Sequence, residues 1–432
     1  MGNRSNEDGG VKNNPGVVRV HGIASLRKLR TFNSFKNPGF RIYYGGLLGQ
    51  MAGMNMQRIA RSLLVYRMTG SATILSIMFL AEAVPMLCLS LFGGVIADRI
   101  QKKYVMLVGQ GASTLVTLGV ALALTLGYLS TENSNSWWLL IIASVLQGII
   151  MGLMMPSRQA ILPEIVNEEE LMNAVSLATM GMNVLQIIAP ALAGFLIAAF
   201  DFDIVYYAMT GTYLISVVFI IFLPTADKVK TVITSALAEI QEGLSYIKHN
   251  TTILIILLAT LFMVVLSMPF MQLLPVFTED ILNVGASGLG ILMSVSGAGA
   301  IAGSLLFASL PNKKRGLMLL AGSLLLGLTL TGFSFSTSWP LSLGLMFFIG
   351  ISQSARMSLS TTLIQYYVDS TYRGRVMSVL MMQFGLTSFS TFLAGLMTDY
   401  IGIEWSVGGF AIILVIFSIL ALAFIRRIRD LD

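Results

Sequence analysis

The sequence is poor in the residues that disulfide frameworks and most metal sites require. It contains one cysteine, Cys88, and two histidines, His21 and His249, among 432 residues. A single cysteine excludes an internal disulfide, a CxxC redox pair and a thiolate metal cluster. Both histidines lie in polar segments, so we expect no histidine metal site within a membrane. We predict no catalytic residues, no metal and no cofactor.

Charged residues are also scarce, at 11% of the chain against about 25% in an average soluble domain. Hydrophobic residues make up 55%, and the mean hydropathy is +0.80. This composition argues against a soluble enzyme, a nucleic-acid-binding protein or a disordered scaffold, and it predicts a polytopic membrane protein. The sequence also lacks a P-loop, which argues against an ATP-driven pump.

Long apolar runs recur along the whole chain. Crossing the hydrocarbon core of about 30 Å takes about 20 apolar residues in a helix. Twelve stretches meet that requirement, at about 42–66, 72–96, 104–128, 137–155, 174–198, 205–223, 252–277, 288–309, 316–335, 340–363, 375–398 and 405–425. Because backbone groups in lipid must bond internally, we predict an all-α protein with twelve transmembrane helices.

The basic residues alternate with these spans. Of the 27 Lys and Arg residues, 23 fall in the two termini or in every second loop, and the opposite loops carry acidic residues only. By the positive-inside rule, both termini are predicted to be cytoplasmic in a multi-pass plasma (inner) membrane protein.

The chain divides into two similar halves around a polar linker. We predict a disordered basic tail at 1–38, six-helix bundles at 39–223 and 252–425, a linker at 224–251 and a short tail at 426–432. Shifting the sequence by 202 residues lays Met155 on Met357 and Val166 on Val368. This weak repeat favours a 6+6 pseudo-symmetric transporter.

The linker itself has a helical pattern. Its apolar residues are spaced four, three, four and three positions apart, which predicts one apolar stripe: Ile233, Leu237, Ile240, Leu244 and Ile247. An amphipathic helix on the inner membrane face and a surface helix packed on the bundle both fit this pattern.

Few polar residues lie at membrane depth, where a charge is costly and is a functional candidate by default. Glu82 is the one acid expected in the hydrocarbon. It lies at a depth similar to that of Arg58 on the neighbouring helix, so we predict a Glu82–Arg58 pair. This pair either couples proton movement to transport or is a structural ion pair. The candidates for lining a substrate cavity are Asn55, Gln57, Arg61, Gln353 and Arg356.

Several motifs resemble those of a known family. The run GGVIADRIQKKYVML contains Gly94, Asp98, Arg99, Lys102 and Lys103, PSRQAILPEIVNEEELMNAVSL covers 156–177, and APALAG covers 189–194. Together they resemble the major facilitator superfamily, in its branch of drug:proton antiporters and enterobactin (siderophore) exporters. Gln101 stands where that family usually has glycine, and Ala189 and Ala193 replace glycines.

The resemblance implies the 6+6 major facilitator fold and roles for two sets of residues. It implies that the loop residues Gly94, Asp98, Arg99, Lys102 and Lys103 act in gating. It implies close helix packing by the antiporter-helix residues Gly181, Ala189, Pro190, Ala193 and Gly194. A capping charge at Asp98 and simple packing of the small residues are the alternatives.

The expected function is secondary active export of a small, largely apolar compound, drug-like or siderophore, by proton antiport and alternating access. The alternatives are uptake or facilitated diffusion, lipid flipping and, least favoured, a membrane receptor or enzyme. The expected partners are the small-molecule substrate and the lipid bilayer, with no nucleic acid, and we expect a monomer.

Overall fold

The fold is known from a computed structural model, which describes residues 30–130, 135–224, 236–310, 313–369, 372–429 and 431. Throughout these residues the regular structure is helical, without strands. The predicted tail at 1–38 lies outside the described residues up to position 29, and so does Ile233 of the linker stripe.

The long helices follow the apolar runs of the sequence. They are α1 (Pro38–Thr69), α2 (Ala72–Arg99), α3 (Lys102–Thr125), α4 (Trp138–Ala160), α6 (Glu168–Phe200), α7 (Phe202–Ile221), α9 (Thr251–Gln272), α11 (Gly285–Ser309), α12 (Arg315–Ser334), α13 (Trp339–Tyr367), α14 (Arg373–Ile401) and α15 (Ile403–Phe424). Short segments join them: η2 (Arg30–Lys36), α5 (Leu162–Ile165), α8 (Ala236–His249), α10 (Leu274–Val276), η3 (Phe277–Ile281) and α16 (Arg426–Arg429).

Ten of these helices are long and apolar enough to cross a membrane: α2, α3, α4, α6, α7, α9, α11, α12, α14 and α15. One predicted span ends early. The run 252–277 stops as a regular helix at Gln272, and Pro275 follows at the start of the next short helix. Proline cannot donate a backbone hydrogen bond, so the chain continues as the short turns α10 and η3.

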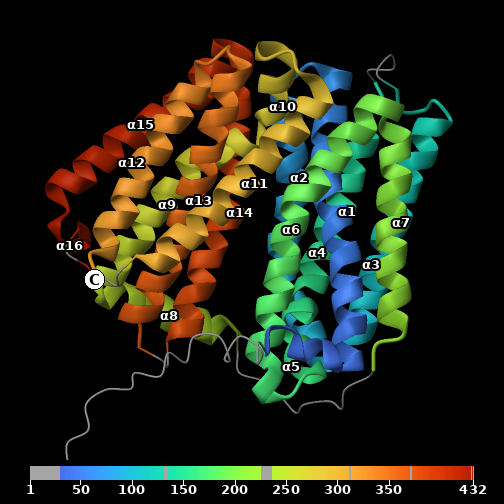
Figure 1. The fold of residues 1–432 in the computed structure, drawn as a ribbon, viewed down its shortest axis with the longest axis horizontal. Helices are drawn as coiled ribbons and strands as arrows, with labels where there is room; N and C mark the ends of the chain where they lie inside the picture. The colour runs from blue at the N-terminus through green and yellow to red at the C-terminus, as the bar shows by residue number, and fades with distance from the viewer. Residues whose placement is uncertain are drawn as a thin grey trace, which may run out of the picture.

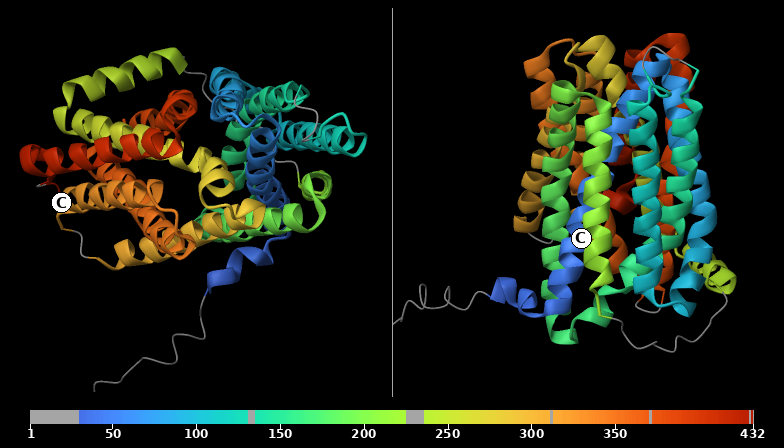
Figure 2. Two further views of the ribbon diagram at one scale, coloured as in Figure 1. Left: turned by 90° about the horizontal axis from the view of Figure 1, so that it is seen from above. Right: turned by 90° about the vertical axis from the view of Figure 1, so that its right-hand side faces the viewer.

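The helices form two side-by-side bundles, α1 to α7 and α9 to α15 (Figure 1). The helices run nearly parallel within each bundle, and the view from above shows the two groups flanking a central region (Figure 2). α10 lies at one end of the molecule and α8 at the other (Figure 1). These two ends are called the α10 end and the α8 end.

The linker helix α8 contacts the start of α14. Arg375 pairs with Glu242 at 2.9 Å, and the Tyr246 ring stacks on Tyr372 with centroids 4.2 Å apart. The Tyr246 hydroxyl donates to Asp369 at 3.0 Å. In the described part of the stripe, Ile247 is buried and Leu244 is exposed.

Two seams join the bundles. At α6–α11, a Cβ added to Gly194 would lie 2.4 Å from the Ala286 carbonyl oxygen, so the backbones nearly touch. At α2–α14, a Cβ on Gly395 would lie 2.3 Å from Ser76 Oγ. Small residues allow this approach, and a larger side chain would force the two bundles apart.

Candidate functional site

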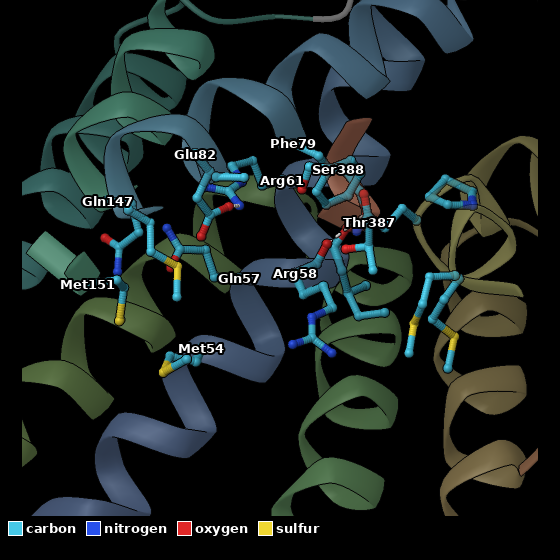
Figure 3. A pocket seen from close by; sticks show the side chains of 18 of the residues that line it. Met54, Gln57, Arg58, Arg61, Phe79, Glu82, Gln147, Met151, Thr387 and Ser388 are labelled. Carbon is cyan, nitrogen blue, oxygen red and sulfur yellow. Dashed lines mark hydrogen bonds and ion pairs between the residues drawn. The ribbon is translucent and has the colours of Figure 1, made fainter. Parts of the chain in front are cut away.

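A cavity of about 490 Å³ lies between the two bundles. Drug-sized ligands occupy cavities of about 300–1,000 Å³. Its lining comes from α1, α2 and α4 of the first bundle and from α9, α10, α11 and α14 of the second. Among the described lining residues, only Arg58, Arg61 and Glu82 carry a charge (Figure 3).

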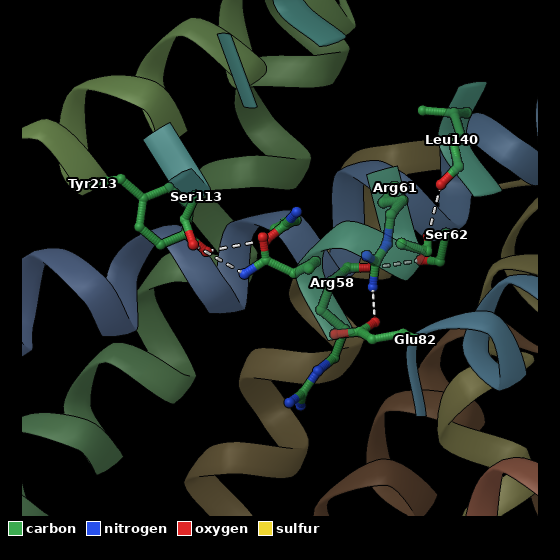
Figure 4. A network of polar contacts seen from close by, with 10 residues as sticks. Arg58, Arg61, Ser62, Glu82, Ser113, Leu140 and Tyr213 are labelled. Atoms are coloured by element: carbon green, nitrogen blue, oxygen red, sulfur yellow. Dashed lines mark hydrogen bonds and ion pairs between the residues drawn. The ribbon is translucent and has the colours of Figure 1, made fainter. Parts of the chain in front are cut away.

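Arg61 and Glu82 form an ion pair across α1 and α2 in this cavity (Figure 4). The Arg61 side chain is only 6% exposed, whereas that of Glu82 is 26% exposed. Nε and Nη1 of Arg61 are buried without a hydrogen-bond partner among the described atoms. The guanidinium is therefore held from one side by Glu82, and the carboxylate remains accessible from the cavity.

The predicted Glu82–Arg58 pair is wrong, because the partner of Glu82 is Arg61, one turn further along α1. Helical side chains lean towards the N-terminus of their own helix. Since α1 and α2 run in opposite directions, Glu82 leans towards the α10 end while the arginines lean towards the α8 end. Arg61 therefore meets Glu82, and Arg58 points away from it (Figure 4).

Neutral polar contacts surround this pair. Tyr213 donates its hydroxyl to Gln57 Oε1 at 3.0 Å, which ties α7 to α1. Gln147 Nε2 donates to Ser113 Oγ at 3.4 Å, which ties α4 to α3. Ser62 Oγ donates to the Arg58 carbonyl at 2.7 Å. Buried tyrosine and glutamine bonds of this kind fix the arginine-bearing face of α1 towards the cavity.

Backbone packing positions Glu82 in α2. A Cβ added to Gly148 of α4 would lie 2.1 Å from the Glu82 carbonyl oxygen, so only glycine allows this crossing. Pro85 lies inside α2, three residues after Glu82. A proline ring clashes with the backbone carbonyl four residues earlier and supplies no N–H donor. α2 therefore lacks one helical hydrogen bond close to Glu82.

Three other predicted cavity residues lie elsewhere. The Asn55 amide donates to the Met51 carbonyl of its own helix at 2.8 Å and does not line the cavity. Arg356 of α13 is 4% exposed, donates to Gln353 Oε1 at 2.9 Å and lines a separate small pocket with Gln383. Only Gln57 and Arg61 of the predicted cavity set line the main cavity.

The predicted gating loop joins α2 to α3. Lys102 forms an ion pair with Glu164 of the same bundle, with side chains 15% and 16% exposed. A Cβ on Gly94 would meet nothing within 4 Å, whereas one on Gly93 would lie 2.4 Å from the Gly152 carbonyl oxygen. The close crossing thus depends on Gly93. The Asp98 side chain lies outside the described part of the structure.

The predicted antiporter-helix residues lie in α6. Ala189 and Ala193 are buried, and Gly194 and Pro190 face α11 of the other bundle, where a Cβ on Gly290 would lie 2.7 Å from the Pro190 carbonyl oxygen. Gly181 faces α1, with its added Cβ 2.6 Å from the Tyr44 hydroxyl. The neighbouring Ser294 hydroxyl of α11 donates to the Ile187 carbonyl at 2.6 Å.

Polar contacts join the bundles at the α10 end. Arg67 pairs with Glu279 at 2.9 Å, and Tyr66 donates to Asp280. The Asp399 carboxylate accepts from Ser71 Oγ at 2.9 Å and from the backbone N–H groups of Ala72 and Thr73 at 3.1 and 3.3 Å. We call this set of contacts the α10-end latch.

Among the described residues, no ion pair joins the two bundles at the opposite end. Between described residues there, the ion pairs are Lys102–Glu164 within the first bundle and Arg375–Glu242 between α14 and the linker helix α8. Within the described part of the chain, the α10-end latch therefore fastens one end of the molecule, in addition to the two seams between the bundles.

Sequence reasoning missed the residues of the latch and most of the cavity wall. In the sequence, Arg67, Glu279 and Asp399 cannot be told from other charged residues near helix ends. Six methionines line the cavity: Met54, Met86, Met151, Met268, Met271 and Met293. The sequence contains 26 methionines, and their number alone does not indicate which of them face one another.

Comparison with known proteins identifies the class. A family model described as transmembrane secretion effector matches residues 29–432. The chain belongs to this family, a branch of the major facilitator superfamily. It is therefore a multi-pass plasma membrane transporter of small molecules and not an enzyme. Transporters of this superfamily generally use ion gradients and need no cofactor.

Individual relatives are more distant. The staphyloferrin A transporter of Staphylococcus aureus is 27% identical over 85% of this chain and 90% of its own length. The macrolide efflux protein A of Streptococcus pyogenes is 25% identical over 94% of this chain and all of its own length. A crystal structure of a D-xylose–proton symporter shares the fold, with a TM-score of 0.72 at 12% identity, over 90% of this chain and 98% of that chain.

Proposed function

We propose that the protein is a proton-coupled exporter of small, largely apolar compounds, and that Glu82 carries the coupling proton. The observation that carries this proposal is the Arg61–Glu82 pair. It contains the one acid among the described cavity residues, held against a buried arginine and still open to the cavity. Protonation of Glu82 removes the charge that holds Arg61, so the pair links proton binding to a rearrangement between α1 and α2.

The proposed topology has twelve spans. The two helices beyond the ten apolar ones are α1 and α13, of 32 and 29 residues, which are long enough to cross a bilayer. They carry the deep arginines Arg58, Arg61 and Arg356, which lower their hydropathy. The alternation of basic and acidic loops supports a cytoplasmic α8 end and cytoplasmic termini.

Matching helix crossings support the 6+6 arrangement. Gly148 meets the Glu82 carbonyl in the first bundle, and Gly350, which follows it by 202 positions, meets the Ser296 carbonyl in the second. An added Cβ would lie 2.1 and 2.0 Å from these oxygens. The same α2–α4 type of crossing thus recurs as α11–α13, as expected of a duplicated unit.

With this orientation, the structure corresponds to an inward-facing state, closed outside by the α10-end latch. Alternating access then requires the latch to open as the α8 ends approach one another. We further propose that one chain is the working unit, because both bundles of a single chain line the cavity.

The experiment is probe-induced proton flux in proteoliposomes. Two fluorescent probes are used, the anion pyrenebutyrate and the cation pyrenebutyltrimethylammonium. They share a pyrene group and differ in charge. We expect protein-dependent, proton-coupled flux of at least one probe, and loss of that coupling in Glu82→Gln. Glutamine keeps the shape and hydrogen-bonding capacity of the side chain but carries no titratable proton.

A control separates coupling from folding, because Glu82→Gln leaves Arg61 buried without its partner. The double variant Arg61→Gln/Glu82→Gln removes both charges and should restore the thermal stability lost in the single variant. A stable double variant without proton flux supports the coupling role. Normal coupled flux in either variant would reduce the pair to a structural contact.

The alternatives are uptake or facilitated diffusion and lipid flipping. Probe flux that is unchanged when the proton gradient is dissipated favours facilitated diffusion. Protein-dependent movement of a labelled phospholipid, without movement of either probe, favours a flippase. The names of the relatives leave drug-like and siderophore substrates both open.

A further inference from the structure

The cavity contains an arginine that lacks a counter-charge. Arg58 is exposed although it lies along the middle of α1, because its side chain opens into the cavity (Figure 3). Within the described residues its guanidinium has no hydrogen bond and no ion pair. An arginine remains protonated in proteins and offers five donors in a planar fork. In a mainly apolar cavity this fork is suited to binding an anionic group.

The balance of charges in the cavity points the same way. Arg61 and Glu82 neutralise one another, so the described lining carries one net positive charge, on Arg58. No described acid lines the cavity unpaired. A cationic compound would therefore have to displace Arg61 from Glu82, whereas an anionic compound meets a guanidinium that is already available.

The remaining wall suits a large apolar group. The six cavity methionines come from α1, α2 and α4 of the first bundle and from α9 and α11 of the second. Unbranched, polarisable methionine side chains adapt to apolar and aromatic ligands of different shapes. The wall thus provides adaptable apolar contact, and Arg58 provides one fixed polar contact.

We propose that the transported compounds are apolar or aromatic carboxylates, with the carboxylate bound by Arg58 and the apolar body against the methionines. A carboxylate accepts two parallel N–H bonds from a guanidinium, which gives both strength and orientation. This inference rests on the proposed export function and names the substrate class of the same cavity.

An anionic substrate also fits outward transport. An inside-negative membrane potential favours export of a negative charge by about 2.3 kcal/mol per 100 mV.

The test is equilibrium binding of three pyrene probes to the purified full-length protein. The probes are pyrenebutyrate, neutral pyrenebutanol and pyrenebutyltrimethylammonium, which differ mainly in their terminal group. We expect wild type to bind the carboxylate most tightly and the cation least tightly. Arg58→Gln should weaken carboxylate binding about ten- to hundredfold and leave alcohol binding within about twofold, because only a charge-assisted contact is lost.

Two further variants sharpen this result. Arg58→Lys keeps the charge but not the bidentate fork, so it should retain part of the carboxylate preference. Arg41→Gln removes an exposed arginine near the α8 end of the same helix and should change nothing. Wild type that binds the alcohol or the cation as tightly as the carboxylate, or that binds no probe, overturns the inference. Proton-coupled flux of the cation alone would retain the exporter and still reject the carboxylate class.

Discussion

The two bundles share a helix crossing but place different chemistry at it. In the first bundle, Gly148 brings α4 against the backbone of Glu82, and the carboxylate extends into the cavity. In the second bundle, Gly350 brings α13 against the backbone of Ser296, which is buried and neutral. The same backbone crossing therefore carries an ionisable group in the first bundle and a neutral serine in the second.

The deep arginines differ in the same way. Arg61 of the first bundle has Glu82 as a charged partner, whereas Arg356 of the second has the neutral Gln353. The residues that the second bundle contributes to the cavity lining are uncharged, and they include Met268, Met271 and Met293. The difference suggests that proton and charge recognition belong to the first bundle, and that the second bundle shapes and closes the cavity.

Replacing each arginine by methionine tests this difference, and the largest effect is expected here. Arg61→Met strands Glu82 without its partner and should cost about 3–5 kcal/mol of unfolding free energy. Arg356→Met removes a buried cation that has no charged partner, so the thermal melting temperature should stay the same or rise. Melting of the two purified variants in one detergent measures both effects.

The opposite order of stabilities would break the comparison. If Arg356→Met were as destabilised as Arg61→Met, the second bundle would hold a charge that compensates Arg356. If Arg356→Met melted normally but lost probe flux, Arg356 would act in transport from its own small pocket.

Alanine at the two equivalent glycines gives a smaller effect. Gly148→Ala and Gly350→Ala each place a Cβ against a carbonyl oxygen and should destabilise by about 1–3 kcal/mol. Only Gly148→Ala displaces the backbone of Glu82, so it alone should reduce proton-coupled flux per folded molecule. The flux is measured in proteoliposomes with matched amounts of folded protein.

Gly111→Ala is the matched control. A Cβ there meets nothing within 4 Å, so stability should be unchanged or slightly higher. Equal loss of coupling in Gly148→Ala and Gly350→Ala would show that both crossings matter equally for transport. That result would contradict the assignment of proton coupling to the first bundle.

The sequence predicted the helices better than the site, and the reason is physical. Apolar runs of about 20 residues locate membrane helices because desolvation of the backbone leaves few alternatives. Glu82 could be found because it is the one acid in such a run. Its partner could not, because the choice between Arg58 and Arg61 depends on the opposite lean of side chains on antiparallel helices.

Contacts between distant segments were beyond the same reasoning. Arg67 and Glu279 are separated by 212 positions. In the sequence, each is a charged residue near a helix end with nothing that indicates its partner. Gly93 and Gly94 are adjacent in one motif, and only the crossing with α4 distinguishes them. Such choices depend on how whole helices pack, which a single sequence does not encode locally.

The smallest expected effect concerns the α10-end latch, where the two bundles meet as partners. Asp399 accepts from the first N–H groups of α2, a position at which a carboxylate also gains from the helix dipole by about 0.3–1 kcal/mol. The partly exposed Arg67–Glu279 pair contributes about 0–1 kcal/mol. Asp399→Asn should therefore shift the balance between inward- and outward-facing states by about fivefold at most.

Spin labels at the α8 end measure this shift. Lys103→Cys and Lys313→Cys place one label on each bundle, in a Cys88→Ser background that removes the native thiol. Opening the latch should shorten the distance between the labels, since the bundles tilt as units about the α6–α11 and α2–α14 seams. Asp203→Asn is the control, because Asp203 bonds the Ile204 N–H of its own helix. If the double variant Asp399→Asn/Arg67→Gln gives the same label distances as Asp203→Asn, the latch does not set the balance between inward- and outward-facing states. The functional difference between the bundles would then lie in their cavity charges alone.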